Sequence, residues 1–470
     1  VAFTTTLLIA NNHPSTTTTN IDHDHGDEGG HHTSRSSIIM QHLLHILALS
    51  LGPTAKDAPT FHCAPMQCYT NQPLRKLFHL LSPSSIKWTE MEKLDDIFPK
   101  TKSVDYLQTN LEKRLGPSQS FDETNLVLQL GSNDPDRLKV CVEHAVQSYS
   151  FRELNLNCGC PAIESGGAST YGASLMKQPD LTASLIDSVK RGLEAGISSE
   201  SDRPNISVKC RIGVFDDAEQ MRPLDEKDYD YLKEYITTIH KAGANHVVLH
   251  ARPAILSGLS PVKNRIIPTL DYDFVRSIAA EFEGKVDITL NGGITSLTQL
   301  NSLRSDTSSP ISNYMAGRWS LRRPMDLVGV EELLKDESSA SSKETTTIKT
   351  ALENYIDYAL TMATLPSHKQ RFTTADLCLP LYLAVEQLKD DWDYDEEDNP
   401  SEDPPLLSYD EIESLYDVVR DGITSLQECC NKGGKKSKNS SNAYKLISTS
   451  IKSLAGTKVV NKWKRNRAEL

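Results

Sequence analysis

Two cysteines and a proline that follow an apolar run in the middle of the chain are the residues best suited to chemistry. The segment Leu154–Met176 reads LNLNCGCPAIESGGASTYGASLM. It begins as a strand, breaks at Cys158-Gly159-Cys160-Pro161, and enters a helix towards its end. The thiol of Cys160 thus follows the carboxyl end of a strand, where Gly159 permits close backbone approach and Pro161 offers no N–H. In barrels of alternating strands and helices, this end of the strands carries the chemistry.

Residues 58–317 contain eight short apolar runs, most of them separated by helical patterns. The strands that they predict would position the Cys160 thiol. The expected strands are Thr60–Ala64, Ile86–Thr89, Asn125–Leu130, Glu153–Asn157, Ile206–Arg211, His246–His250, Asp287–Asn291 and Asn313–Ala316. The clearest expected helices are Asp134–Ser148, Leu181–Leu193 and Asp228–Ala242. Strands alternating with helices predict a parallel sheet, and eight of them predict a (β/α)8 TIM barrel of the α/β class.

Nearly every predicted strand ends in a residue that can bind or react, and all these ends meet at one rim. The residues are Ala64-Pro65-Met66, Gln129-Leu130-Gly131, Asn157, Lys209, Arg211, His250, Arg252, Asn291-Gly292-Gly293 and Gly317-Arg318. Each has an ordinary explanation when taken alone, such as a core histidine or a glycine turn. Their gathering at one rim favours a binding site.

The last two strand ends indicate what this site would bind. Glycine loops that open onto helix N-termini offer backbone N–H groups to a phosphate, and Arg318 would add a charged donor. Lys209 would place a positive charge beside an electron-rich ring, and Gln129 would hydrogen-bond its polar edge. A phosphorylated, redox-active flavin fits this set. No G-x-G-x-x-G follows a strand, so a Rossmann dinucleotide domain is excluded.

Cysteine usage and charge set further limits. None of the nine cysteines forms a CxxC pair, which indicates a reducing compartment and no disulfide scaffold. A zinc site on Cys158 and Cys160 is disfavoured by the single intervening residue, and we expect no metal.

The net charge of −13 hides an uneven distribution of charged residues along the chain. Residues 390–403 hold nine acids and no base, whereas residues 432–467 hold eleven Lys or Arg and no acid.

A series of motifs runs in order from Phe61 to Pro324. They are Ala64-Pro65-Met66 with Thr70 and Arg75, Thr89-Glu90-Met91, Leu128–Gly131, Leu154–Pro161, Val208–Gly213, His250-Ala251-Arg252, Leu256–Leu270, Asn291–Ile294 and Gly317-Arg318. This series resembles the tRNA-dihydrouridine synthases. The stretch Gly258–Pro261, followed by Asn264 and Arg265, is most similar to the A-type subfamily.

The resemblance implies an FMN-binding barrel, a helical tRNA-binding domain and a monomeric protein. NADPH would reduce the FMN, and a D-loop uridine, U20 or U20a, would be pulled out of its stack onto the flavin. Hydride would pass from flavin N5 to uracil C6, and Cys160 matches the cysteine that protonates C5. A thiol in a loop suits this role, because the product enolate needs an acid on the face opposite the flavin.

The same match assigns further residues by position. Those expected to bind FMN are Ala64, Pro65, Met66, Gln129, Lys209, His250, Asn291, Gly292, Gly293, Gly317 and Arg318. Those expected to contact the substrate are Asn157, Arg211, Arg252, Asn264 and Arg265. The residues that depart from the family pattern are Asn71, Ala162, Glu164 and Pro253. Glu164 replaces a basic residue, and its repulsion from phosphate would weaken tRNA binding.

The chain is expected to divide into four parts. They are a disordered or targeting extension at 1–55, the barrel at 56–330, a helical tRNA-binding domain at 345–430 with a disordered acidic insertion at 390–405, and a basic tail at 431–470. Expected helices of the third part are Thr347–Met362, Ala375–Leu388 and Leu407–Leu426. Ile38–Leu51 is too short and too polar to span a membrane, and no membrane partner is expected. A cytoplasmic or an organellar location, in a mitochondrion or a plastid, stays open.

Two alternative readings stay open at this point. One is another FMN barrel, such as a dihydroorotate dehydrogenase, although a small pyrimidine substrate needs neither a helical domain nor a basic tail. The other is a degenerate family member that binds tRNA or only FMN without reducing uridine. The changes at Ala162, Glu164 and Pro253 support the second reading, and the presence of Cys160 and the phosphate loops opposes it.

Overall fold

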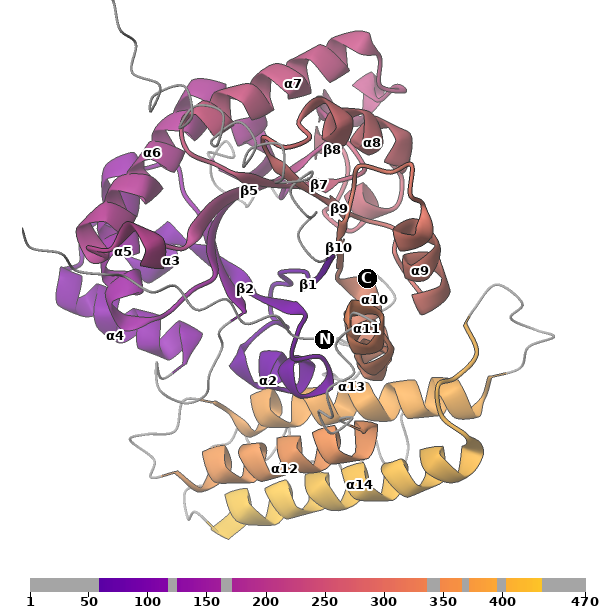
Figure 1. The fold of residues 1–470 in the computed structure, drawn as a ribbon. Coiled ribbons are helices and arrows are strands. Elements are labelled where there is room, and N and C mark those ends of the chain that lie inside the picture. The colour runs from indigo at the N-terminus through magenta and orange to yellow at the C-terminus, as the bar shows by residue number, and fades with distance from the viewer. Residues whose placement is uncertain are drawn as a thin grey trace, which may run out of the picture. The chain divides into compact units, whose positions relative to one another are not determined.

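A computed structural model of the chain (Figure 1) describes residues 59–116, 125–161, 171–335, 347–365, 372–394 and 403–432. Every described residue belongs to one compact unit, residues 57–470. The predicted extension at 1–55, the tail beyond Lys432, and the departing positions Ala162 and Glu164 lie outside the described residues.

Eight parallel strands close into a barrel, which confirms the predicted fold class (Figure 1). They are β1 Thr60–Cys63, β2 Ile86–Lys93, β3 Leu126–Gly131, β4 Glu153–Cys158, β5 Asn205–Arg211, β7 His246–His250, β9 Asp287–Asn291 and β10 Asn313–Ala316. The order around the barrel is β1-β10-β9-β7-β5-β4-β3-β2, so strands that follow one another along the chain pair directly. Short, largely apolar strands of this kind are buried on both faces once helices cover the barrel.

Helices surround the barrel because each has an apolar face that must be buried. They are α2 Gln72–Leu81, α3 Leu94–Ile97, α4 Val104–Leu115, α5 Pro135–Ser148, α6 Pro179–Gly196, α7 Glu226–Lys241, α8 Tyr272–Glu281, α9 Leu297–Ser305, α10 Arg318–Arg322 and α11 Leu327–Leu334. Side-chain caps fix where several of them begin. Asp134 accepts the backbone N–H of Arg137 at the start of α5, and Asp271 accepts that of Phe274 at the start of α8.

The strand register brings polar residues from distant parts of the sequence to one level of the barrel rim. Asn157 on β4 is paired with Lys209 on β5. His250 on β7 is paired with Arg211 on one side and with Asn291 on the other. The parallel arrangement therefore places these carboxyl-end residues around the same mouth, as the strand ends predicted.

A second, two-stranded parallel sheet was not predicted. It pairs β6 Val214–Asp217 with β8 Ala254–Ser257 in the segments that directly follow β5 and β7. Each strand has only two or three apolar residues, and the pairing partner is forty residues away. The strands form because the barrel brings the two segments together, and local periodicity carries no sign of this contact.

Three helices follow the barrel, α12 Ile348–Thr364, α13 Thr374–Trp392 and α14 Tyr409–Lys432. They overlap the three helices expected there. Thr373 and Asp376 form a capping box at the start of α13, and the hydroxyl of Tyr355 on α12 donates to the carbonyl of Leu377 at 2.7 Å. In the part of the chain that the structure describes, we find no helix with the length and apolarity needed to span a bilayer.

A buried polar cluster joins α13 to the segment that follows α10. Arg323 donates to Asp326 at 2.8 Å and to Asp391 at 2.7 Å. Gln387 donates to Asp326 at 2.8 Å. The acidic run was expected to be a disordered insertion from residue 390, but α13 continues to Trp392. Asp391 is buried because its carboxylate is paired with Arg323, so the start of this run is structural.

Candidate active site

The loop that carries Cys160 is held from two sides. The side-chain oxygen of Asn157 accepts the backbone N–H groups of Gly159 at 3.2 Å and of Cys160 at 3.0 Å. The carbonyl of Cys160 accepts the N–H of Ala173 at 2.8 Å. Gly172 has a φ of +74°, and a Cβ there would lie 2.5 Å from the same carbonyl. Glycine is therefore required where the chain returns past the cysteine.

The two cysteines of this loop differ in environment. Cys160 is partly exposed, whereas Cys158 is completely buried. Burial raises the pKa of Cys158 to about 12. Only Cys160 of the two lines the adjoining cavity, so of these two thiols it is the one that a ligand there would meet.

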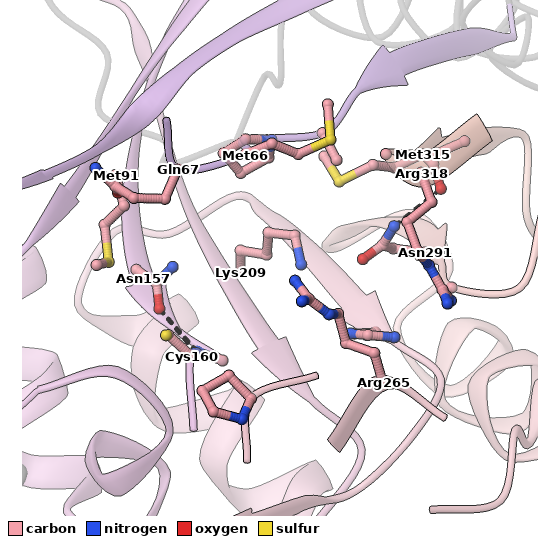
Figure 2. Close-up of a pocket in the computed structure, with 18 of the residues that line it drawn as sticks. Met66, Gln67, Met91, Asn157, Cys160, Lys209, Arg265, Asn291, Met315 and Arg318 are labelled. Atoms are coloured by element: carbon pink, nitrogen blue, oxygen red, sulfur yellow. Dashed lines mark hydrogen bonds between the residues drawn. The ribbon is translucent and has the colours of Figure 1, made fainter. Parts of the chain in front are cut away.

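A cavity of about 450 Å³ opens at the carboxyl ends of the barrel strands (Figure 2). All of the predicted site residues line it except Arg252 and Asn264. In Figure 2, Lys209 extends into the cavity between Asn157 and Cys160 on one side and Asn291 and Arg318 on the other. Residues from both halves of the barrel thus converge on one space, which is the arrangement expected of a TIM-barrel active site.

The cavity wall is cationic. Its charged side chains are Lys209, Arg211, Arg265 and Arg318, and none of its described lining residues is Asp or Glu. Burial, reinforced by Arg211, lowers the pKa of Lys209 to about 8. Burial also lowers the pKa of Arg318, and Arg265 adds to this effect by repulsion. Like charges gathered without a carboxylate favour an anionic ligand.

Glycines shape the part of the cavity beside Arg318. Gly292 and Gly293 have φ values of +105° and +75°. A Cβ on Gly292 would lie 2.5 Å from the His250 ring, and one on Gly293 would lie 2.5 Å from Leu270. Both the backbone conformation and the space therefore require glycine, which leaves a close approach to the backbone at the end of β9.

Three methionines contribute to the apolar surface of the cavity. Met66 was predicted to bind the cofactor, whereas Met91 was named only in the motif Thr89-Glu90-Met91 and Met315 was given no role in the site. Figure 2 labels all three. Polarisable thioether side chains adapt well to the face of an aromatic ring. The only available signal for the two missed residues was their position at or beside a strand end, because an apolar residue there looks like core.

Two arginines and an asparagine that were predicted to contact the substrate also have structural partners. Asn264 is completely buried, and its side chain hydrogen-bonds the backbone of Ile255 in both directions, at 2.7 and 2.9 Å. Arg252 donates to the carbonyls of Ile266 and Pro268 outside the cavity. Arg211 lines the cavity, but it also donates to the carbonyls of Gly159, Pro253 and Asn264. These side chains hold the rim loops together; Asn264 and Arg252 lie outside the cavity, and their expected contacts with the substrate stay predictions.

The family model and the curated relatives that match this chain carry the same family description. The family model described as dihydrouridine synthase (Dus) matches residues 62–378. The tRNA-dihydrouridine(20/20a) synthase of Shewanella oneidensis is 32% identical over 315 residues, which cover 66% of this chain and 82% of that protein. The protein of the same name from Xanthomonas campestris pv. campestris is 34% identical over 253 residues, covering 53% and 65%.

Similarity to solved structures is weaker. A complex of 2-naphthoyl-CoA reductase has a TM-score of 0.40 and 9% sequence identity, covering 58% of this chain and 50% of that one. The old yellow enzyme from Trypanosoma cruzi has a TM-score of 0.36 and 9% identity, covering 62% and 92%.

Proposed function

The chain belongs to the dihydrouridine synthase family, and from this premise we propose that it reduces uridine 20 or 20a in the D-loop of tRNA to dihydrouridine, with FMN as cofactor and NADPH as reductant. The position within tRNA is taken from the names of its relatives. The observation that carries the proposal is the cationic cavity with Cys160 on its wall.

The residues of the cavity fit FMN. Buried Nε2 of His250 has no hydrogen-bond partner among the described residues, so it is free for a polar ligand atom. Gly292 and Gly293 leave room for a phosphate against the backbone, and Arg318 supplies a charged donor beside them. Met66 and Met315 offer an apolar surface to a flat ring. We propose that these residues hold the cofactor.

Cys160 is proposed as the acid of the reaction. When bound and reduced, FMN supplies the hydride for uracil C6. The chain must then supply a proton to C5 from the other face of the base. Cys160 is the thiol that reaches the cavity, and its loop is fixed by Asn157 and Gly172. This placement supports an active enzyme over a degenerate binder, because a binder would have no need of a fixed acid.

The distribution of charged residues indicates which part of the protein would contact the tRNA phosphates. The described residues of the three C-terminal helices and their flanks, 347–365, 372–394 and 403–432, carry 14 acidic and 4 basic side chains, a net charge of −10. Such a surface repels phosphates. We therefore propose that the phosphates contact the basic barrel rim, including Lys263, Arg265 and Arg322, together with the basic tail at 431–470. The helical part would bind tRNA through its shape and through few charged contacts.

The proposal is tested with the full chain and unmodified tRNA. Purified protein should show the absorption spectrum of bound FMN, and NADPH should bleach it. Addition of tRNA should then form dihydrouridine, which is measured by mass spectrometry of digested tRNA. Bound FMN with no dihydrouridine formed would overturn the proposed reaction, and an absence of FMN binding would overturn the proposed cofactor.

A further inference from the structure

A continuous series of buried polar side chains runs into the barrel interior from the cavity. Asn157 donates to the Gln129 side-chain oxygen at 3.0 Å, and Gln129 donates to that of Asn155 at 2.9 Å. Asn155 donates to the Ser207 hydroxyl at 2.7 Å, and that hydroxyl donates to the carboxylate of Glu153. All five side chains are buried.

The two ends of this series fix its direction. At the cavity, the side-chain oxygen of Asn157 accepts the N–H groups of Gly159 and Cys160, which can only donate. At the far end, one oxygen of the Glu153 carboxyl group accepts from the Ser207 hydroxyl, and its second oxygen lies 2.8 Å from Nδ1 of His246. Each amide between these ends has one orientation that satisfies both neighbours.

The direction of hydrogen-bond donation along this series determines which atom of the Asn157 side chain is left for a ligand. Both lone pairs of its side-chain oxygen are used by backbone N–H groups. One N–H of its amide is used by Gln129, so the atom left for the cavity is the second N–H. Asn157 therefore presents a donor and no acceptor. A carbonyl oxygen satisfies this donor, whereas an amino group placed there would oppose it with another donor.

A barrel interior is ordinarily filled by branched apolar side chains. Burying two amides, a hydroxyl and a carboxylate beneath the cavity is unfavourable unless every group is paired, and a half-satisfied series is worse than an apolar core. Here each member between Asn157 and Glu153 donates to the next and accepts from the one before. A role in orienting the cavity amides accounts for its presence.

We propose that Asn155, Ser207 and Glu153 are positioning residues that hold Gln129 and Asn157 in one orientation, and that Asn157 thereby selects a base with a carbonyl group over one with an amino group. The inference rests on the proposed function, in which the base is uridine. Cytidine differs from uridine by an amino group in place of a carbonyl, so a donor-only contact at this edge would reject it.

The test compares buried variants of the full chain. Asn155→Leu removes the acceptor of Gln129 with a side chain of similar size, and Ser207→Ala removes the hydroxyl of the series. Ser85→Ala is the matched control. Ser85 is as completely buried as Ser207, and its hydroxyl donates to the carbonyl of Ser82 at 2.8 Å outside the series.

Each variant is measured in three ways: kcat and KM with unmodified tRNA, inhibition by the same tRNA with cytidine at the target position, and thermal unfolding. We expect wild type and Ser85→Ala to bind the uridine tRNA at least about tenfold more tightly than the cytidine tRNA. We expect Asn155→Leu to lower kcat by about tenfold to a hundredfold and to abolish most of this preference. Ser207→Ala should have the same effects in weaker form.

The outcomes separate the inference from the function on which it rests. If Asn155→Leu and Ser207→Ala keep the kcat and the uridine preference of Ser85→Ala and differ from it only in thermal stability, the series is structural and the inference is overturned. If Asn155→Leu fails to fold, Ser207→Ala alone decides in the same way. If wild type forms no dihydrouridine while binding FMN and tRNA, the proposed function itself fails.

Discussion

The side-chain oxygen of Asn157 accepts the backbone N–H of Cys160 at 3.0 Å, so the last residues of β4 fix the loop that carries the thiol (Figure 2). The same oxygen accepts the N–H of Gly159. This hydrogen bond ties the thiol-bearing loop to the end of β4 over a span of four residues. The orientation of the Cys160 thiol therefore depends on the side-chain amide of Asn157. A proton donor must be held in register with its target atom, because small displacements cost much of the rate.

We expect Asn157→Ala to lower kcat for uridine reduction by about tenfold to a hundredfold, since it frees the N–H groups of Gly159 and Cys160. Asn157→Asp keeps an acceptor for both N–H groups but loses the donor that meets Gln129. It should preserve the loop and impair mainly the binding of the base, which raises KM. Steady-state kinetics with unmodified tRNA distinguishes the two. Equal kinetic defects in both variants would contradict the separate roles of oxygen and N–H.

Gly293→Ala should destabilise the protein and reduce FMN retention. An L-residue at a φ of +75° costs about 1–2 kcal/mol, and the new Cβ would also lie 2.5 Å from Leu270. Gly284→Ala is the matched control, because Gly284 has a φ of +72° and a Cβ there would have no atom within 4 Å. Thermal unfolding and flavin content after gel filtration provide the measurements. Full flavin retention in Gly293→Ala would show that this glycine does not shape the cofactor site.

FMN affinity should fall as the pH rises through about 8. Burial and Arg211 lower the pKa of Lys209 to about 8, so its positive charge is lost near that pH. Loss of one charge facing an anion should weaken binding by about tenfold. Fluorescence titration of FMN between pH 7 and pH 9 measures this change. Lys209→Met carries no titrating group, and its affinity should vary little over the same range.

The lowered pKa of Lys209 should also make the FMN-free protein more stable as the pH rises, whereas it makes FMN binding weaker. The pKa of Lys209 is lower in the folded state than in the unfolded chain, so between the two values the unfolded state binds more protons. The contribution of Lys209 to the free energy of unfolding therefore rises with pH above about 8. Denaturant unfolding of FMN-free wild type and Lys209→Met should show this difference in slope. A wild-type slope equal to that of the variant would contradict the lowered pKa.

Asp391→Ala should lower the free energy of unfolding by about 2 kcal/mol, because it removes a buried carboxylate that accepts from Arg323 at 2.7 Å. Asp393→Ala, at the exposed residue that directly follows the same helix, should change it by less than about 0.5 kcal/mol. Urea denaturation gives both values. Similar effects of the two substitutions would mean that the Arg323–Asp391 pair does not hold α13 against the barrel.

The strands were predictable because each is a short apolar run bounded by polar residues. His246–His250, Asp287–Asn291 and Asn313–Ala316 have the predicted bounds. Four others differ by one residue at one or both ends, whereas β2 continues to Lys93 although Thr89 was its expected end. A register shift between Trp88 and Met91 lets this strand continue through alternating polar residues next to the cavity. Periodicity marks where a regular strand ends, but it does not reveal an irregularity that prolongs it.

A position at the cavity was predictable where a reactive or charged residue follows a strand end, as for Cys160 and Arg318. A residue's place in or outside the cavity was not predictable where it depends on hydrogen bonds and packing with other parts of the chain. Asn264 and Arg252, which the resemblance assigned to the substrate, lie outside the cavity and hydrogen-bond backbone groups of neighbouring loops. Met315 looks like core and lines the cavity. The polar series below Asn157 was also invisible, because hydrogen bonds between different strands follow from the barrel register.

The central claim is that Cys160 protonates the reduced base, and the rate of dihydrouridine formation by Cys160→Ala tests it most directly. Cys158→Ala is the control, because that thiol is two residues away, buried and outside the cavity. With FMN, NADPH and unmodified tRNA, we expect Cys160→Ala to bind tRNA normally and to form product at least about a hundredfold more slowly than wild type. Cys158→Ala should remain within a few-fold of wild type. Product formation by Cys160→Ala at the rate of Cys158→Ala would contradict the account.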